Sequence, residues 1–224
     1  MKGSVLVTGG ARRIGRAICE TLAARGWRVL VHSRDPRNPL RADFAEPDAA
    51  ERLFAAAVAC APDLCAIVNN AALFSPAAEL PADAVATLRA VNVTVPVRLA
   101  ELLAAHLAER HVAGAVVNLL DTRILGAFRG DKGLDLTPYA ASKLALAHAT
   151  MAQARSLAPT LRVGGVAPGP VLAPADVASR EKGGDILLPR RPTPADVASA
   201  VAFLLEAEAV TGQILAVDSG QCLL

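Results

Sequence analysis

The residues best suited to acid–base chemistry are Tyr139 and Lys143, which are separated by Ala140-Ala141-Ser142. Tyr139 is the only tyrosine in the chain. On an α-helix, positions i and i+4 lie on one face, so the Lys143 ammonium can stabilise a phenolate and lower the pKa of Tyr139 from about 10. The spacing therefore predicts a phenol that exchanges a proton with a bound molecule.

A glycine-containing turn near the N-terminus has the residues to hold phosphate. Thr8-Gly9-Gly10-Ala11-Arg12-Arg13-Ile14-Gly15 follows a short apolar run and precedes a segment of helical periodicity. Glycine lets an anion approach the backbone, and the N–H groups and dipole of a helix N-terminus attract it. Arg12 and Arg13 add guanidinium groups suited to phosphate. We expect Gly9, Arg12, Arg13, Ile14 and Gly15 to bind a dinucleotide pyrophosphate.

The end of the next apolar run indicates which dinucleotide is bound. Enzymes that use NAD need a carboxylate there for the ribose 2′-hydroxyl, whereas this chain has His32-Ser33-Arg34 before Asp35. The Ser33 hydroxyl and the Arg34 guanidinium favour a 2′-phosphate. We therefore expect NADPH over NADH, although a carboxylate, Asp35, lies one residue further on.

These groups need a scaffold, and apolar runs that read as strands occur near residues 5–7, 27–31, 66–68, 115–120, 163–166 and 214–217. Segments of helical period separate them. Continuous apolar strands alternating with helices indicate a parallel sheet covered on both faces. We predict an α/β, doubly wound (Rossmann) fold with a mostly parallel sheet of seven strands, in one domain over residues 1–224. Residues 34–43 are long enough only for a loop, where such folds normally place a helix.

One long segment lacks a clear period. Residues 172–192 are rich in proline and scattered charges and follow the end of a predicted strand. Ligands in open α/β sheets bind at the carboxyl ends of the strands. We therefore expect this segment to be a substrate lid.

Composition narrows the class of protein. The chain has 224 residues, of which 53% are hydrophobic and 20% charged, as in a compact globular domain. A net charge of +2 favours neither a nucleic-acid nor a membrane partner. The N-terminus lacks a signal-peptide core, and the cysteines lack metal spacing. We expect a cytoplasmic protein without a metal site that acts on a small molecule.

Five motifs occur in a fixed order along the chain, namely Thr8 to Gly15, Asn69-Asn70-Ala71-Ala72, Asn92-Val93, Tyr139-x-x-x-Lys143 and Pro168-Gly169. Together they resemble the short-chain dehydrogenase/reductase family over nearly the whole chain. The resemblance implies that Tyr139 exchanges the substrate proton, that Lys143 holds the nicotinamide ribose, and that Asn92 supports a water relay. It also implies that Asp43 contacts the adenine and that other residues contact the cofactor, namely Asn70, Ala71, Pro168, Gly169 and Val171. A homo-oligomer, either a tetramer or a dimer, is implied in the same way.

Three departures from the family pattern are informative. Arg13 replaces the middle glycine of the turn, Asp121 replaces the catalytic serine, and Phe74 stands at a position that faces the nicotinamide pocket. All three resemble the pteridine reductase and dihydromonapterin reductase branch. That resemblance implies substrate contacts from Arg13, stacking of a pterin on Phe74, and proton donation by Asp121 with Tyr139.

Electrostatics agrees with this reading, because a carboxylate beside Tyr139 opposes Lys143 and keeps the phenol protonated, which suits reduction of a ring C=N. The leading hypothesis is an NADPH-dependent reductase of a pterin-like heteroaromatic. An alternative is a carbonyl or 3-oxoacyl-thioester reductase in which Asp121 only orients Tyr139, and basic residues of the lid meet an anionic carrier (Arg180, Lys182, Arg190 and Arg191). A third is a non-catalytic NADP(H)-binding protein, since the usual serine is absent. The connection from Asp121 to Tyr139 is longer than pterin reductases usually have, so we expect a different pocket wall.

Overall fold

The computed structural model describes residues 2–126, 137–171 and 185–224. Its centre is a parallel sheet in the order β2-β1-β3-β4-β5-β6. The strands are β1 (Ser4–Val7), β2 (Arg28–Val31), β3 (Leu64–Asn69), β4 (Gly114–Leu119), β5 (Leu161–Pro168) and β6 (Ile214–Val217). The strand order reverses between β1 and β3, and open α/β sheets bind ligands at the carboxyl edge beside such a point.

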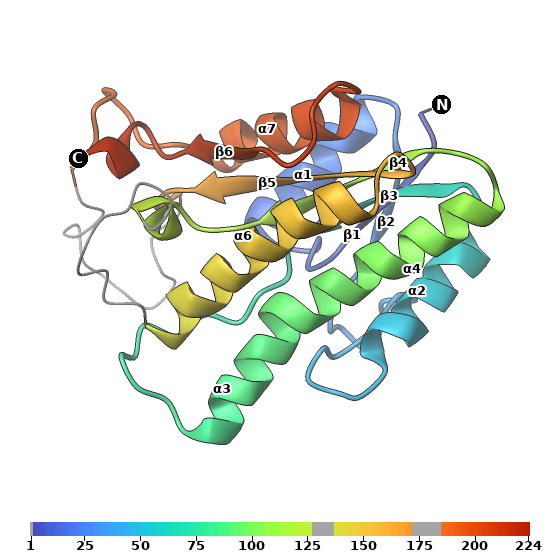
Figure 1. Cartoon of the computed structure of the whole chain (residues 1–224), viewed down its shortest axis with the longest axis horizontal. Helices are drawn as coiled ribbons and strands as arrows, with labels where there is room; N and C mark the ends of the chain where they lie inside the picture. Colours follow the sequence, from blue (N-terminus) through green and yellow to red (C-terminus); the bar gives the residue numbers. More distant parts are fainter. Residues whose placement is uncertain (1, 127–136, 172–184) are drawn as a thin grey trace.

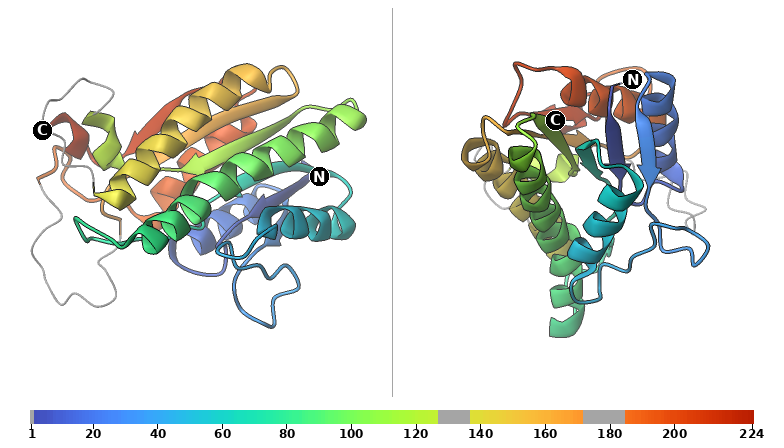
Figure 2. Two further views of the ribbon diagram at one scale, coloured as in Figure 1. Left: turned by 60° about the horizontal axis from the view of Figure 1, so that its bottom comes forward. Right: turned by 90° about the vertical axis from the view of Figure 1, so that its right-hand side faces the viewer.

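Helices cover both faces of the sheet (Figures 1 and 2). On one face lie α1 (Arg13–Ala24) and α7 (Pro194–Glu206), and on the other lie α2 (Ala49–Cys60), α4 (Val95–Glu109) and α6 (Pro138–Ser156). Side chains of a strand alternate between faces, so Val5 and Val7 pack with α1 and α7 while Leu6 packs with α2 and α4. The predicted doubly wound fold is confirmed.

The prediction of seven strands is wrong, because the described residues form six. After β2, residues 34–40 form turns and no helix, as expected from their length. The chain then returns to the sheet edge for a single parallel bridge between Ser33 and Arg41. Leu40 and Ala42 are buried in the core beside this bridge. The connection after β2 is too short to form both a helix and a further strand. Its only pairing with the sheet among the described residues is the single bridge between Ser33 and Arg41.

A continuous helical stretch, Ala82–Glu109, is long and apolar enough to span a membrane. It comprises α3 (Ala82–Arg89), a π-helical turn (Ala90–Thr94) and α4. Its largest apolar side chains, Leu99, Leu103 and Leu107, are fully buried in the core against the sheet and α2. Packing in the protein core therefore accounts for its hydropathy.

The two longest connections are described only at their ends. Residues 172–184 of the predicted lid, including Arg180 and Lys182, lie outside the described residues, as do residues 127–136 between Asp121 and Tyr139. The described end of the lid is tied to the C-terminal segment, since the N–H groups of Leu187 and Leu188 both donate to the carbonyl of Ser219. Short 3₁₀ turns, η2 (Thr122–Ile124) and η3 (Gln221–Leu223), lie at the same edge of the sheet.

Candidate active site

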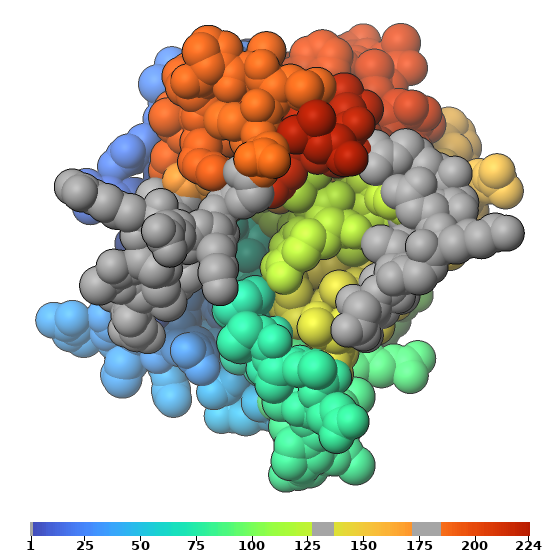
Figure 3. All heavy atoms as spheres, turned by 90° about the vertical axis from the view of Figure 1, so that its left-hand side faces the viewer, coloured from blue at the N-terminus to red at the C-terminus, as the bar shows by residue number. Residues whose placement is uncertain are grey.

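A cavity of about 860 Å³ opens at the carboxyl ends of the strands. Figure 3 looks onto this edge, which is hollowed between the teal residues after β3 and the yellow-green residues after β4. The structure places most of the predicted site residues in its lining, namely Gly9, Arg12, Arg13, Ile14, Gly15, Ser33, Arg34, Asp43, Asn70, Ala71, Asp121, Tyr139, Pro168, Gly169 and Val171. Three predicted residues lie outside the lining, namely Phe74, Asn92 and Lys143.

The glycine turn packs so closely that Gly15 leaves no space for a side chain. Gly9 has a φ of +63°, and a Cβ on Gly15 would collide with the Gly9 carbonyl and lie 2.6 Å from Nδ2 of Asn70. No side chain caps the N-terminus of α1, and its first turn contains no acidic residue. Uncapped N–H groups and the positive end of the helix dipole therefore lie beside the cavity, as a pyrophosphate requires.

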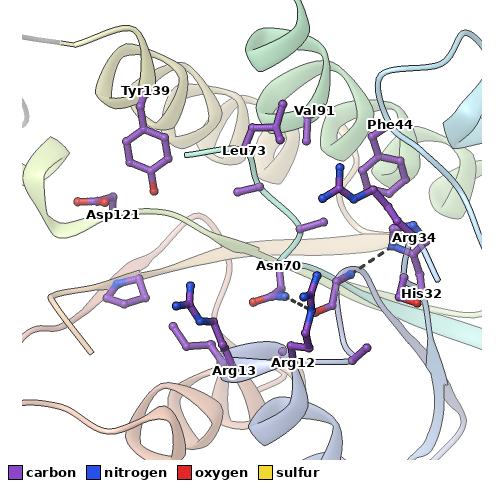
Figure 4. Close-up of a pocket in the computed structure, with 18 of the residues that line it drawn as sticks. Arg12, Arg13, His32, Arg34, Phe44, Asn70, Leu73, Val91, Asp121 and Tyr139 are labelled. Carbon is purple, nitrogen blue, oxygen red and sulfur yellow. Dashed lines mark hydrogen bonds between the residues drawn. The ribbon is translucent and has the colours of Figure 1, made fainter. Parts of the chain in front are cut away.

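Thr8 and Asn70 join the ends of β1 and β3 at the reversal of strand order. Oγ1 of Thr8 accepts hydrogen bonds from the backbone N–H groups of Asn70 and Ala71, both at 3.0 Å. Nδ2 of Asn70 donates to the carbonyls of Thr8 at 2.9 Å and Gly9 at 3.1 Å. This network fixes the floor of the cavity beneath the two arginines (Figure 4).

Arg13 keeps the backbone conformation of the glycine that it replaces. Its φ is +51°, in the left-handed region that costs a non-glycine residue roughly 1–2 kcal/mol. The guanidinium groups of Arg12 and Arg13 point into the cavity from the start of α1 (Figure 4). The strained backbone places a cation in the cavity, and the part of Arg13 in binding cofactor or substrate stays a prediction.

The far end of the cavity suits a 2′-phosphate. Ser33 and Arg34 line it, whereas the Asp35 carboxylate is held by Arg37, with Nε at 3.2 Å and Nη2 at 3.0 Å, and does not contribute to the lining. Asp43 also lines the cavity, and its carboxylate caps the backbone N–H of Ala45 at 3.1 Å. The residues present at the end of β2 therefore fit NADPH better than NADH.

Sequence reasoning missed His32 and Phe44 as lining residues. Nδ1 of His32 accepts from the N–H of Gly9 at 3.2 Å, which leaves Nε2 to donate to the carbonyl of Ala42 at 3.1 Å. The imidazole stacks on the Phe44 ring with centroids 4.5 Å apart. Burial lowers the pKa of His32, so a neutral ring supports the glycine turn. The position of His32 at the end of a strand was the available signal; nothing marked Phe44.

Tyr139 and Asp121 both line the cavity and lie near each other at one end of it (Figure 4). Tyr139 lies in the first turn of α6, where Thr137 caps the helix through the N–H of Ala140 at 3.3 Å. Burial raises the pKa of Tyr139, and the charge of Asp121 and a hydrogen bond to it act in the same direction. Asp121 thus keeps the phenol protonated, as the sequence predicts.

Lys143 is buried beneath Tyr139. Its Nζ lies 5.8 Å from the centroid of the Tyr139 ring and donates to the carbonyl of Leu119 at 2.7 Å. Burial lowers the pKa of Lys143 to about 8, against the opposing charge of Asp121. The pKa of Tyr139 is raised on balance, by burial first and then by Asp121, while the charge of Arg123 acts in the opposite direction. The effect of the Lys143 ammonium on the phenol stays a prediction.

Asn92 fixes the segment that precedes Phe74. In the π-helical turn, its Nδ2 donates to the Leu73 carbonyl at 2.9 Å and to Oγ of Ser142 at 3.0 Å, and its Oδ1 accepts from the N–H of Leu73 at 2.8 Å. Ser142 in turn donates to the carbonyl of Tyr139 at 2.7 Å. Asn92 therefore joins the β3 loop to α6; its part in a water relay stays a prediction.

Phe74 and Arg123 contact Tyr139 and each other, although neither lines the cavity. The Phe74 ring is 58% exposed and meets the Tyr139 ring edge to face. Arg123 forms a two-pronged ion pair with Asp121, through Nε at 3.0 Å and Nη2 at 2.9 Å. Sequence reasoning missed Arg123, for which the Asp-x-Arg spacing was the available signal. It also missed the apolar lining residues Leu73, Val91 and Leu120, which read as core.

Comparisons with known proteins agree with this geometry. A family profile described as enoyl-(acyl carrier protein) reductase matches residues 9–221. The chain is 30% identical to dihydromonapterin reductase from Klebsiella pneumoniae, over 97% of this chain and 95% of that protein. It is 30% identical to carbonyl reductase family member 4 from Danio rerio, over 100% of both chains. The crystal structure of FolM alternative dihydrofolate reductase 1 from Brucella canis, complexed with NADP, has a TM-score of 0.84 and 32% identity over 99% of this chain and 95% of that one.

Proposed function

Since the chain belongs to the short-chain dehydrogenase/reductase family, we propose that it is an NADPH-dependent reductase of a pterin-like bicyclic heteroaromatic. The observation that carries this proposal is the Asp121–Tyr139 pair beside the exposed ring of Phe74. The dihydromonapterin reductase and alternative dihydrofolate reductase relatives support the same substrate class.

The chain's own residues would hold NADPH along the cavity. The turn from Gly9 to Gly15 and the uncapped N-terminus of α1 take the pyrophosphate, and Ser33 with Arg34 takes the 2′-phosphate. When bound, NADPH supplies a hydride. Asn70, Pro168 and Val171 also line the cavity, and they would set the direction from which that hydride approaches.

Tyr139 and Asp121 would manage the proton that accompanies the hydride. As a ring carbon of the substrate accepts hydride, the electron pair of the C=N bond moves to nitrogen, which needs a proton. The pKa of Tyr139 is raised by burial and by Asp121, so the hydroxyl carries its proton at neutral pH. A positioned acid of this kind contributes roughly 10²–10⁴-fold to the rate.

Phe74 would bind the flat part of the substrate. Its ring is exposed yet held by its contact with Tyr139, which lines the cavity, and by Asn92, which fixes the neighbouring Leu73. A heteroaromatic ring that stacks on it gains about 0.5–1.5 kcal/mol beyond area burial. A small aliphatic ketone would gain no such stacking energy.

The second candidate is a carbonyl or 3-oxoacyl-thioester reductase. It is favoured by the carbonyl reductase relative and by the family profile described as enoyl-(acyl carrier protein) reductase. In this candidate, basic residues of the predicted lid bind an anionic carrier. Arg190 is less suited to that role, because its guanidinium already binds Asp196 at 2.6 and 2.9 Å.

The test is NADPH oxidation by the purified chain with dihydrobiopterin or dihydromonapterin, in parallel with an acetoacetyl thioester. Turnover of the pterin that collapses in Asp121→Ser supports the proposal. Turnover of the thioester that survives in Asp121→Ser selects carbonyl reduction. Tight NADPH binding without turnover of either substrate supports the non-catalytic reading. Assembly as a dimer or tetramer stays a prediction of the family resemblance. A cytoplasmic location stays a prediction from the sequence, which shows no signal-peptide core.

A further inference from the structure

One cation, the Arg123 guanidinium, contacts three functional side chains of the site. Its Nε donates to Oδ1 of Asp121 at 3.0 Å and its Nη2 to Oδ2 at 2.9 Å, while the Arg123 backbone N–H donates to Oδ1 at 2.9 Å. Its Cζ lies 5.2 Å from the Tyr139 ring centroid and 5.7 Å from that of Phe74. Arg123 therefore lies at the junction of the carboxylate, the phenol and the exposed ring.

The ion pair itself arises locally from the Asp-x-Arg spacing. The same three contacts form between Asp35 and Arg37, at 2.9, 3.2 and 3.0 Å. The surroundings differ, because the Asp121 side chain is 14% exposed and faces Tyr139, whereas that of Asp35 is 44% exposed. Screening by water is weaker at Asp121, so its ion pair has the greater effect on its neighbours.

The geometry at Asp121 is that of an ionised carboxylate. Both oxygens accept hydrogen bonds from a guanidinium that stays protonated at any ordinary pH, and a proton on either oxygen would displace one of them. Within the described parts of the chain, the charged or titratable groups that face Asp121 are Arg123 from η2 and Tyr139 and Lys143 from α6. Of these, Tyr139 is the neutral group with a proton to donate.

We propose that Arg123 is a positioning residue: by holding both oxygens of Asp121 it fixes this carboxylate as the acceptor for the Tyr139 hydroxyl, so that Tyr139, and not Asp121, delivers the proton. The inference rests on the proposed function for the nature of the substrate, a ring C=N. In the step, hydride adds to carbon, the C=N electron pair moves to nitrogen, the Tyr139 O–H bond breaks and an N–H bond forms. The phenolate then regains a proton from water.

Arg123 also acts on the phenolate that this step leaves behind. A phenolate beside the Asp121 carboxylate is a repulsive pair, and the Arg123 charge lowers the pKa of Tyr139 against that repulsion. Without Arg123 the proton is harder to release, and the carboxylate is free to turn away from the hydroxyl. Both effects act on kcat and neither acts on the cofactor end of the cavity.

The first test is a double-mutant cycle with Arg123→Leu and Asp121→Asn. Arg123→Leu should lower kcat roughly 10- to 100-fold, as expected when a catalytic acid is misplaced, with the Kd for NADPH changed by no more than about twofold. Arg123→Lys, which keeps the charge but loses the two-pronged geometry, should recover part of kcat. Asp121→Asn keeps an acceptor oxygen but no acidic proton, so it should retain far more activity than Tyr139→Phe, and adding Arg123→Leu to it should have little further effect.

A second test needs no substrate. Because Tyr139 is the only tyrosine, ¹³C-tyrosine labelling gives one Cζ resonance that reports on its hydroxyl. Arg123→Leu should shift this resonance in the wild-type background and shift it much less in Asp121→Asn. Arg37→Leu removes the equivalent ion pair at Asp35 and should leave it unmoved.

Each outcome separates this inference from the proposed function. If the wild type reduces a thioester and no pterin, the proposed function fails, and the cycle is measured on the thioester, which needs the same proton. Three results would overturn the positioning role of Arg123. The first is that the two substitutions change kcat independently, and the second is that Arg123→Leu leaves the Cζ resonance unshifted. The third is that Asp121→Asn loses as much activity as Tyr139→Phe.

Discussion

The ring of Phe74 meets the ring of Tyr139 edge to face, with centroids 4.9 Å apart and planes at 79°. The two rings differ sharply in exposure, since Phe74 is 58% exposed and Tyr139 only 8%. The buried Tyr139 ring thus fixes the orientation of the exposed Phe74 ring. Under the proposed function, this contact would couple the binding of a flat substrate to its protonation.

Phe74→Ala should weaken substrate binding more than catalysis. Loss of a stacking surface of about 0.5–1.5 kcal/mol predicts a rise in KM for a dihydropterin of roughly 2- to 12-fold. Steady-state kinetics at saturating NADPH measures it. Phe203→Ala on α7, where the ring is 51% exposed on the other face of the sheet, is the matched control and should change neither parameter. An unchanged KM in Phe74→Ala would remove Phe74 from the substrate site.

Arg13→Gly should make the protein more stable and bind NADPH less well. Glycine adopts the φ of +51° without the cost of about 1 kcal/mol that arginine bears, offset in part by the greater entropy of the unfolded chain. Loss of the guanidinium should raise the Kd for NADPH roughly 10-fold or more. Thermal unfolding and a fluorescence titration measure the two effects. A lower Tm together with an unchanged Kd would contradict the role given to Arg13.

Ser33→Asp should move the cofactor preference toward NADH. A carboxylate at the end of β2 repels a 2′-phosphate and accepts from a 2′-hydroxyl, whereas the native Asp35 is turned away by Arg37. The ratio of kcat/KM for NADPH to that for NADH should fall by roughly 10-fold or more, since a charged hydrogen bond contributes about 1.5–3 kcal/mol. An unchanged ratio would place the 2′-phosphate elsewhere.

His32 should make the protein less stable in mild acid. Burial lowers its pKa in the folded state, so below about pH 6.5 the unfolded chain binds a proton that the folded chain does not, and the free energy of unfolding falls as pH drops. His32→Gln removes the imidazole, so the free energy of unfolding should fall less steeply as the pH drops from 7 to the lowered pKa of His32. His111→Asn, an exposed site after α4, is the control. An equal slope in wild type and His32→Gln would show that other groups govern this range.

The sequence predicts the parts of the site that follow from local chemistry. The turn from Gly9 to Gly15, the segment Ser33-Arg34 and the four-residue spacing of Tyr139 and Lys143 each lie where their residue types indicate. These features are short-range and periodic, so they can be read without coordinates. The seventh predicted strand had no apolar run of its own, since the sequence shows six such runs and the described residues form six strands.

Other features depend on tertiary placement. Phe44 becomes part of the cavity because its ring stacks on His32 across a turn whose path has no periodic signal. The raised pKa of Tyr139 depends first on how deeply its ring is buried. Arg123 gains a role from the side chains that surround its ion pair, since the same spacing at Asp35 and Arg37 produces an exposed pair.

The most direct measurement of the central claim is hydride transfer itself. The purified chain is incubated with NADPH deuterated at C4 and a dihydropterin, and the product is analysed by mass spectrometry, with Tyr139→Phe as the companion. We expect a tetrahydropterin that carries deuterium on ring carbon, formed by the wild type and slowed roughly 10²–10⁴-fold in Tyr139→Phe. Absence of deuterium from the pterin, or equal labelling by the Tyr139→Phe variant, would contradict the account.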